Sequence, residues 1–276
     1  MKPWHLVSFA ALVVALSSPA TAQWPDHRSP KVPRTADGKV NLDAPPPRAA
    51  DGHIDLTGVY ENLWFYNGKI AQPPVSPPGE PPQTTFAEIG AGFKDGLPFR
   101  PWARALHDQR KASNAKDNPD AHCLPMGLMQ FHIHPQPRKI VQTPDLIIIL
   151  YEGNSGIRQI FTDGRALPKI GDVQPWWYGY SVGHWDGDTL VVQTNNFRDD
   201  GWLDINGSPL TDQATLTERY QRLSYGTLRV DVTIDDPKAY TKPFTVRLNQ
   251  KVVPDEELIE FICAENERST AHMVGR

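Results

Sequence analysis

The sequence of 276 residues has only two cysteines and no run of basic residues, and its lysines and arginines are outnumbered by acidic residues, 28 to 32. The basic surface expected of a nucleic-acid-binding protein is therefore missing. The phosphate-loop, dinucleotide-binding and zinc-protease motifs are absent as well. These absences argue against nucleic-acid partners and against several common classes of enzyme.

Long apolar runs are also missing after the first residues, which have the pattern of a secretory signal peptide. Lys2 precedes an apolar stretch from Leu6 to Leu16, and Ala20-Thr-Ala22 supplies the small residues that signal peptidase recognises. The alternative is a membrane anchor, which needs about 20 apolar residues, more than this run provides. We therefore predict removal of residues 1–22 and a periplasmic or secreted protein without a membrane span.

The two cysteines, Cys123 and Cys263, are predicted to form a disulfide, because export places the chain in an oxidising compartment. The bond would close a loop of about 140 residues, which the chain-entropy model values at roughly 4–5 kcal/mol. A thiol nucleophile or a metal ligand is the functional alternative.

Proline is abundant, with 27 residues, and many of them precede position 145. We predict an extended Pro-rich segment over 23–54 and one domain over 55–276, with a loop and helix insertion around 72–137. Within the insertion, residues 72–83 form an extended loop that acts as a spacer or as a lid over a cavity.

Two helices are predicted in the same insertion. One is short and spans residues 85–93. The other spans 101–113, where a proline occupies the first turn and Trp102, Ala105 and Leu106 recur at helical spacing. Its opposite face is charged, so we expect an amphipathic helix that packs on a sheet or caps a barrel end.

From residue 139 onward, short apolar segments alternate with turns. Strands are predicted at 55–61, 139–142, 146–152, 157–161, 178–185, 189–197, 215–223, 228–234, 244–252 and 257–263. The Asp186-Gly-Asp188 turn is typical of a hairpin. Because no helix separates successive strands, the pattern predicts an antiparallel meander.

Alternation within the strands indicates which faces are buried. Over 228–235, leucine, valine and isoleucine occupy every second position and polar residues the others, so this strand has one wet face. About nine such strands close into a barrel or stack as a sandwich, and we favour a mainly β, lipocalin-like barrel. A barrel of this size can hold one small ligand.

Three histidines suggest a possible metal site. His132 and His134 are two positions apart, so on a strand they would share a face, and His122, Asp120 or Glu152 could complete the ligand set. Pro135 and Pro137 follow at once and weaken the expectation of a strand there. The alternative is that these histidines lie on the surface or line a pocket.

Aromatic and small polar residues gather in the strand predicted at 178–185. Tyr178 and His184 would share one face, and Ser181 and Trp185 the other. Trp177 adds aromatic surface next to this strand. Such a surface suits a sugar or an aromatic ligand, and the alternative is that the tryptophans belong to the core.

Charged residues near these aromatics extend the candidate site. Arg158, Arg165 and Asp163 would contact polar groups of a ligand. Glu218 lies on a predicted strand and, if it faces a barrel interior, needs a partner such as Arg158 or Arg222. The pair would be either a structural ion pair or a proton-transfer group.

Eight segments together carry a family resemblance: 55–60 (DLTGVY), 123–127 (CLPMG), 139–144 (KIVQTP), 158–165 (RQIFTDGR), 180–192 (YSVGHWDGDTLVV), 217–219 (TER), 235–243 (DDPKAYTKP) and 263–266 (CAEN). The chain resembles a broad family of exported bacterial proteins of unknown function, abundant in acidobacteria and proteobacteria. The likeness spans residues 55–275 and implies export and a shared fold, but no reaction. It implies no shared metal site, because the positions of His132 and His134 are usually not both histidine in that family.

Two functions from different classes remain open. In the first, the barrel binds a carbohydrate or an aromatic or apolar compound through Trp177, Trp185, Ser181, Arg165 and Asp163. In the second, the same cavity is a lyase, isomerase or hydrolase in which Glu218, Tyr178 or His184 moves a proton and Arg158 stabilises negative charge. No cofactor is expected apart from a metal ion at the histidines, and the sequence predicts no oligomeric state.

Overall fold

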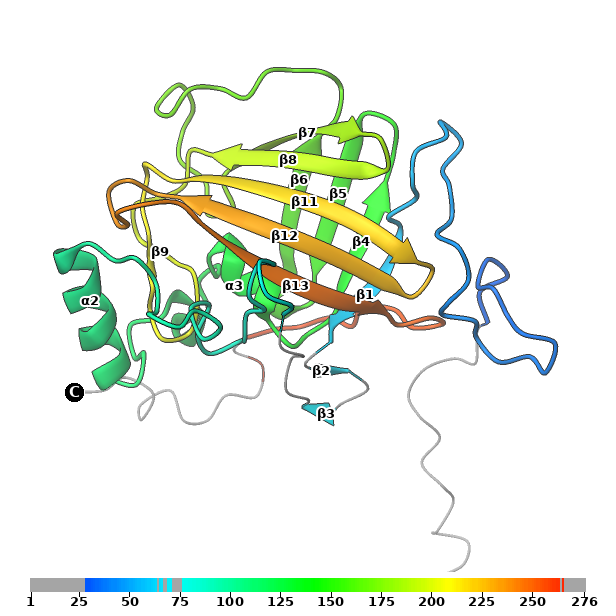
Figure 1. The fold of residues 1–276 in the computed structure, drawn as a ribbon, viewed down its shortest axis with the longest axis horizontal. Coiled ribbons are helices and arrows are strands. Elements are labelled where there is room, and N and C mark those ends of the chain that lie inside the picture. Colours follow the sequence, from blue (N-terminus) through cyan, green and yellow to red (C-terminus); the bar gives the residue numbers. More distant parts are fainter. Residues whose placement is uncertain (1–27, 64, 67–68, 71–75, 264, 266–276) are drawn as a thin grey trace, which may run out of the picture. The chain divides into compact units, whose positions relative to one another are not determined.

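A computed structural model describes residues 28–63, 65–66, 69–70, 76–263 and 265. The predicted signal peptide lies outside these residues. In the described part of the chain, strands close into a barrel (Figure 1): β1 (Gly58–Asn62), β4 (Arg138–Gln142), β5 (Leu146–Tyr151), β6 (Gly156–Phe161), β7 (Tyr180–Asp186), β8 (Thr189–Asn195), β11 (Thr215–Ser224), β12 (Thr227–Asp235) and β13 (Phe244–Val252). The prediction of a mainly β barrel is confirmed.

The strands follow one another around the barrel in chain order, and one pair departs from an antiparallel meander. β1 lies between β4 and β13, and it pairs antiparallel with both. β6 and β7 are joined by a long loop and pair in parallel through Ile160 with Ser181 and Phe161 with Val182. The other neighbouring strands are antiparallel. The barrel is therefore mixed, because the chain must cross over before β7.

Smaller elements lie outside the barrel wall. They are two short ribbons, β2 (Phe65–Tyr66) with β3 (Lys69–Ile70) and β9 (Gly201–Trp202) with β10 (Pro209–Leu210), and two 3-10 turns, η1 (Pro119–His122) and η2 (Gly153–Ser155). No helix among the described residues is long and apolar enough to cross a membrane.

Strand alternation fills the barrel interior as the sequence predicts. On β12, Leu228, Val230, Val232 and Ile234 are buried, and the residues between them are partly exposed. On β5 the buried residues are Ile147, Ile149 and Tyr151. Burying such a side chain stabilises the fold by about 1.5–3 kcal/mol, so these strands specify their inward face strongly.

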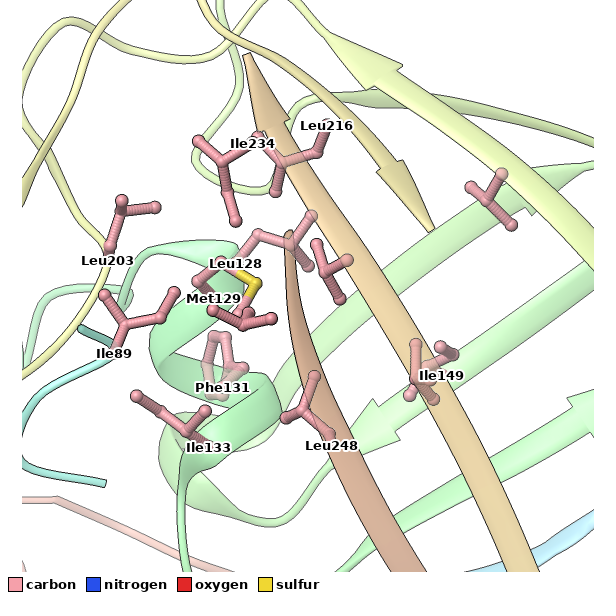
Figure 2. Packing of buried hydrophobic residues seen from close by; sticks show 14 of the residues in the cluster. Ile89, Leu128, Met129, Phe131, Ile133, Ile149, Leu203, Leu216, Ile234 and Leu248 are labelled. Atoms are coloured by element: carbon pink, nitrogen blue, oxygen red, sulfur yellow. The ribbon is translucent and has the colours of Figure 1, made fainter. Parts of the chain in front are cut away.

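A short helix, α3 (Leu128–Ile133), packs into the barrel and was not predicted. Figure 2 shows Leu128 and Met129 of α3 among strand residues such as Leu216, Ile234 and Leu248. Gly127 directly precedes the first residue of α3. A Cβ atom at this position would lie 2.2 Å from the backbone carbonyl oxygen of Trp202. Only glycine permits this close approach, which positions the start of the helix.

The second helix, α2 (Pro101–Ala112), forms where the sequence predicts one, but it buries a different face. Ala103 and His107 are buried, whereas Trp102 is 43% exposed and Ala105 is exposed. The Trp102 indole N–H donates to the carbonyl of Lys238 at 2.8 Å, so this ring lies over a loop at the surface. The predicted apolar face of this helix is therefore wrong.

The helix predicted at residues 85–93 is also wrong, since the segment forms successive turns. The Ile89 N–H donates to the buried carboxylate of Asp204 at 2.9 Å instead of to a carbonyl one turn back. Gly92 packs directly against Pro82, where a Cβ atom would approach to 2.6 Å. Tertiary contacts thus replace the local helical hydrogen bonds.

The second Pro-rich segment fills part of the barrel wall. β1 pairs with β13 only at residues 250–252, and Pro82–Thr84 lies along the earlier part of β13. Arg247 N–H donates to the Pro82 carbonyl at 2.9 Å, and Thr84 N–H donates to the Arg247 carbonyl at 3.2 Å. A void of about 10 Å³, roughly one water molecule in size, lies between this segment and Asn62. The segment therefore closes the wall where β1 is too short.

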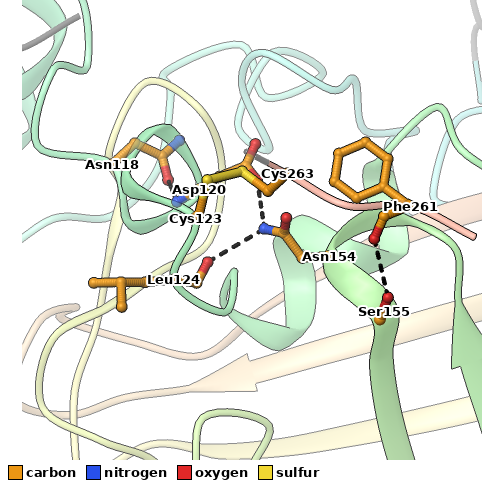
Figure 3. Close-up of a disulfide and its surroundings, with 8 residues drawn as sticks. All are labelled: Asn118, Asp120, Cys123, Leu124, Asn154, Ser155, Phe261 and Cys263. Carbon is orange, nitrogen blue, oxygen red and sulfur yellow. Dashed lines mark hydrogen bonds between the residues drawn. A yellow bond between two sulfur atoms is a disulfide. The ribbon is translucent and has the colours of Figure 1, made fainter. Parts of the chain in front are cut away.

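The predicted disulfide is confirmed. The Cα atoms of Cys123 and Cys263 are 5.6 Å apart, and the bond spans 140 residues. Cys263 does not lie on a strand, so the strand predicted at 257–263 is wrong. That segment instead crosses η2, where the Ser155 hydroxyl donates to the Phe261 carbonyl at 3.2 Å (Figure 3). The disulfide thus ties the chain's last described segment to the loop before α3.

Candidate functional site in the barrel interior

A buried ion pair between Glu218 and Arg158 lies at the centre of the candidate site. Both side chains face inward, from β11 and β6, and both are almost fully buried. Arg158 Nη1 donates to Glu218 Oε1 at 2.9 Å, and its Nη2 donates to Oε2. Of the two partners expected for Glu218, the structure selects Arg158. The fork geometry makes this a bidentate pair.

His132 of α3 joins the pair from inside the barrel. Its Nε2 lies 2.8 Å from Glu218 Oε1, and the Tyr220 hydroxyl donates to the same oxygen at 2.8 Å. The carboxylate can only accept, so it assigns the proton of the neutral imidazole to Nε2. His132 Nδ1 is then an acceptor, and it lies 3.5 Å from the Tyr151 hydroxyl.

Two hydroxyl side chains complete the contacts of Arg158. Ser181 Oγ accepts from its Nε at 3.2 Å, and Thr194 Oγ1 accepts from its Nη2 at 2.9 Å. Seven side chains therefore form one group, called the barrel cluster below: Tyr151, Arg158, Ser181, Thr194, Glu218, Tyr220 and His132. They come from five strands and α3, so only the folded barrel brings them together.

Ser181 also stands in a Gly-x-Ser-x-Gly sequence, residues 179–183, a spacing found at the nucleophile turn of α/β hydrolases. Here the serine lies within strand β7, and its hydroxyl contacts Arg158 and Thr194 instead of an imidazole. The strand-to-helix turn that the motif requires is not formed. Ser181 is thus a polar contact of the barrel cluster, and it lacks the surroundings of a hydrolase nucleophile.

Burial and charge set the protonation of the cluster. Burial alone would raise the pKa of Glu218, but Arg158 and the His132 hydrogen bond outweigh it and hold that pKa below its ordinary value. Burial lowers the pKa of His132 despite the nearby carboxylate, and it raises the pKa of Tyr151 to about 12. At neutral pH the cluster therefore holds one charged pair, a neutral imidazole and neutral phenols.

Three buried side chains at α3 and its carboxyl end have polar atoms without a partner in the described structure. They are both amide atoms of Gln130, Nδ1 of His134 and Nε of Arg138. Arg138 otherwise donates to the His132 carbonyl at 2.6 Å and to the His134 carbonyl at 2.9 Å. Buried polar groups are normally paired, so these atoms are exceptions that call for an explanation.

Sequence reasoning missed Gln130 and Arg138 as site residues. Neither has a motif around it, and Gln130 lies on a helix of six residues, which is too short for hydrophobic periodicity to reveal. The sequence pattern could have identified Arg138, because it opens β4 at a position that alternates with the inward-facing Ile140. A charged residue at such a position is a signal for a buried site.

Most of the predicted ligand contacts lie outside the barrel interior. Arg165 and Asp163 are exposed and pair with each other. Arg165 also donates to the Tyr180 hydroxyl at 3.0 Å and lies 3.8 Å from the centre of the Phe161 ring. Trp177 lies under the guanidinium of Arg198. These residues belong to the loop between β6 and β7 and to its surroundings, and they do not contact the barrel cluster.

The 178–185 segment does not bring its four candidate residues together in one site. His184 is exposed, and Ser181 on the other face is buried in the cluster. Trp185 stacks on His53 with ring centres 4.7 Å apart, so the segment before β1 covers it. Tyr178 precedes β7 and packs edge-on against Phe131 at 5.1 Å. β7 starts after Gly179, which has a φ of +67°.

The predicted metal site is not assembled. His132 and His134 lie on and directly after a helix, so they do not share a face as they would on a strand. His122 is exposed, and its ring Nε2 donates to the Lys116 carbonyl at 2.8 Å. No group of three histidine, cysteine or acidic side chains suited to a metal occurs among the residues that the structure describes. The strand interpretation of these histidines is therefore wrong.

Chemically, the barrel cluster can bind a polar group and can hold a proton. The carboxylate of Glu218 orients His132, and the imidazole presents its Nδ1 to the Tyr151 hydroxyl. Phe131 stacks on Tyr151 with ring centres 4.6 Å apart, which places an apolar aromatic surface beside these polar atoms. This combination of a few polar groups with aromatic walls is typical of small-molecule sites.

Comparison with known proteins gave no matching family model, curated protein or solved structure.

Proposed function

We propose that this protein acts outside the cytoplasm, in the periplasm or as a secreted protein, and binds a small aromatic or apolar molecule inside its barrel. The observation that carries the proposal is the set of unpaired buried polar atoms of Gln130, His134 and Arg138. The Cys123–Cys263 disulfide supports an oxidising compartment.

Energetics favours a functional reason for the polar interior. A buried ion pair is weak evidence for stability, because apolar residues of similar volume often serve the fold equally well or better. An unpaired buried amide such as that of Gln130 costs about 1–3 kcal/mol. A ligand with one or two polar atoms would satisfy these groups while its apolar body packs against Phe131 and Tyr151.

The wall beside Asn62 is the proposed entrance. Asn62 lines the small void next to the Pro82–Thr84 segment, and its side-chain amide donates to the His134 carbonyl at 2.7 Å. Backbone bonds to Arg247 and a side-chain hydrogen bond between Asn249 and Gln83 at 2.9 Å connect the Pro82–Thr84 segment to β13. Outward movement of this segment would open a path from solvent to the carboxyl end of α3.

Fluorescence titration with N-phenylnaphthylamine, a neutral aromatic probe, tests the proposal. We expect saturable binding to one site per chain. Changing Tyr151→Phe should weaken binding about threefold to tenfold, because its hydroxyl is only loosely engaged at 3.5 Å and is available to the probe's amine.

Tyr180→Phe is the matched control, since it removes a hydroxyl that contacts Arg165 on the outer face of β7. Its affinity for the probe should equal that of the unchanged protein. Absence of saturable binding, or an effect confined to Tyr180→Phe, would show that the barrel interior is not the binding site.

A second candidate function is acid–base catalysis, which the hydrogen bond of 2.8 Å between His132 and Glu218 favours. In this alternative, His132 Nδ1 exchanges a proton with a bound substrate, as in an isomerase or a lyase. Tautomerisation of phenylpyruvate is a suitable assay of proton transfer on an aromatic compound. His132→Gln should lower any such activity by about a hundredfold or more, and the exposed His184→Gln should not change it.

A further inference from the structure

We propose that the molecule bound inside the barrel is an anion, whose carboxylate or sulfonate group lies against the guanidinium of Arg138. This inference rests on the proposed function, because it names the chemical class of that ligand. It is carried by the balance of charge among the inward-facing side chains and by a guanidinium nitrogen of Arg138 that has no partner among the described residues.

Positive charge exceeds negative charge in the barrel interior. The buried charged side chains that face inward on the described strands are Arg138, Arg158, Arg222 and Glu218. Glu218 pairs with Arg158, and no carboxylate of the described residues pairs with Arg138 or Arg222. Fully buried cations are rare without an acidic partner, because their desolvation is expensive.

The two unpaired arginines differ in how completely they are satisfied. Arg222 engages all three of its nitrogens: Nη1 donates to the Asp55 carbonyl at 2.6 Å, and Nε and Nη2 donate to the Tyr225 carbonyl. Its guanidinium also lies over the rings of Tyr60 and Tyr225. Arg222 is therefore a structural residue that connects β11 to the backbone at Asp55 and Tyr225.

The Nε donor of Arg138 has no acceptor in the described structure. Its two terminal nitrogens donate to the last carbonyls of α3, whose partial negative charge compensates the cation only in part. Its Nε has no partner in the described structure, although Arg138 is 1% exposed. An anionic group at Nε would satisfy the donor and neutralise the charge together.

The location of Arg138 agrees with the proposed entrance. Its Nη2 and the side-chain amide of Asn62 both donate to the His134 carbonyl, so the two side chains are neighbours. Asn62 in turn lines the void beside Pro82–Thr84. An anion that enters through this part of the wall would meet Arg138 first. The apolar body of the ligand could then lie toward Tyr151, the register partner of Arg138 on β5.

A matched pair of fluorescent probes tests the inference. Anilinonaphthalene sulfonate and N-phenylnaphthylamine share one aromatic skeleton, and only the first carries a negative charge. At physiological salt we expect the sulfonate to bind at least about tenfold more tightly than the neutral probe, as a charge-assisted hydrogen bond in a buried site requires.

The variant Arg138→Gln should reduce this preference to about one, because the sulfonate loses more affinity than the neutral probe. Arg219→Gln is the control, because Arg219 is an exposed arginine paired with Asp186, and it should leave the preference unchanged. Since Arg138→Gln also loosens the end of α3, a second measurement uses the unchanged protein. Benzoate should displace bound N-phenylnaphthylamine at concentrations at which benzyl alcohol does not.

Each outcome separates the two claims. Equal affinity for both probes, with benzyl alcohol displacing as well as benzoate, overturns the anionic ligand and leaves the proposed binding function standing. A preference that survives in Arg138→Gln but disappears in Arg219→Gln assigns the anion to the surface and overturns the inference. If neither probe binds, the proposed function fails, and the inference fails with it.

Discussion

The same chemical pair, an arginine with a carboxylate, occurs inside the barrel and on its outer surface. Inside, Arg158 and Glu218 have side chains that are 1% and 0% exposed. Outside, Arg165 and Asp163 have side chains that are 41% and 31% exposed, and they are separated by a single residue in the turn after β6. The inner pair joins strands 60 residues apart in the sequence.

The two pairs show how burial changes the contribution of an ion pair to stability. The outer pair is solvated with or without its partner, so it contributes little to the fold and mainly shapes a turn. The inner pair can exist only as a pair, because either charge alone would remain buried without compensation. The inner region is therefore both the more fragile of the two and the better suited to recognise a polar group.

The largest expected effect is the loss of one inner partner. Glu218→Gln should reduce the free energy of unfolding by about 3–5 kcal/mol, because Arg158 is left buried without a carboxylate. Asp163→Asn, the same change on the outside, should leave the unfolding midpoint in urea unchanged within error. Urea unfolding followed by circular dichroism measures both.

Removing both charges of the inner pair tests whether the unpaired charge causes the loss of stability. The double variant Glu218→Leu with Arg158→Met should recover at least half of the stability lost in Glu218→Gln, since no unpaired charge remains. If Glu218→Gln and Asp163→Asn lower the midpoint equally, burial does not distinguish the two pairs and the comparison is wrong.

A smaller effect is expected from acid. Burial, reinforced by the nearby cation of Arg138, lowers the pKa of His134 to about 4. Between the ordinary value of about 6.5 and this pKa, the unfolded chain binds a proton that the folded chain does not. The free energy of unfolding should therefore fall by roughly 3 kcal/mol as the pH drops from 7 to 4.

His134→Gln should flatten this part of the pH profile, and the exposed His184→Gln should leave it as it is. Unfolding midpoints measured in a pH series decide between them. A profile that depends on His184 and not on His134 would contradict the assignment of the buried neutral imidazole.

The smallest predicted effect has the opposite sign. Gln130→Leu should raise the free energy of unfolding by about 1 kcal/mol, because it removes an amide that is buried without partners. The same variant should weaken binding of anilinonaphthalene sulfonate. Gln221→Leu is the control, since Gln221 is hydrogen-bonded to Thr189 on the outer face of the barrel and should give no gain in stability. A loss of stability in Gln130→Leu would show that the amide serves the fold.

Local patterns were sufficient to predict most of the barrel wall. The period of two placed β13 at residues 244–252, as the structure has it, and it placed Leu228 to Ile234 of β12 on the inner face. The expectation that a buried Glu218 needs an arginine rests on the cost of an isolated charge, which holds in any fold. Such inferences succeed because they depend on neighbours along one strand or on a general energy.

The rest depends on contacts between distant segments. His132 meets Glu218, 86 residues later, only because α3 packs into the barrel, and nothing in the local sequence places it there. Ser181 faces inward and His184 is exposed, and alternation along the strand does not by itself decide which face points inward. The crossover that makes β6 and β7 parallel has no local signature either.

The most direct test of the central claim is a crystal structure of the protein with N-phenylnaphthylamine. We predict one molecule inside the barrel, in contact with Phe131 and Tyr151 and close to the carboxyl end of α3. A probe found instead on the outer aromatic surface around Trp176 and Tyr180, with the barrel interior unchanged, would contradict it.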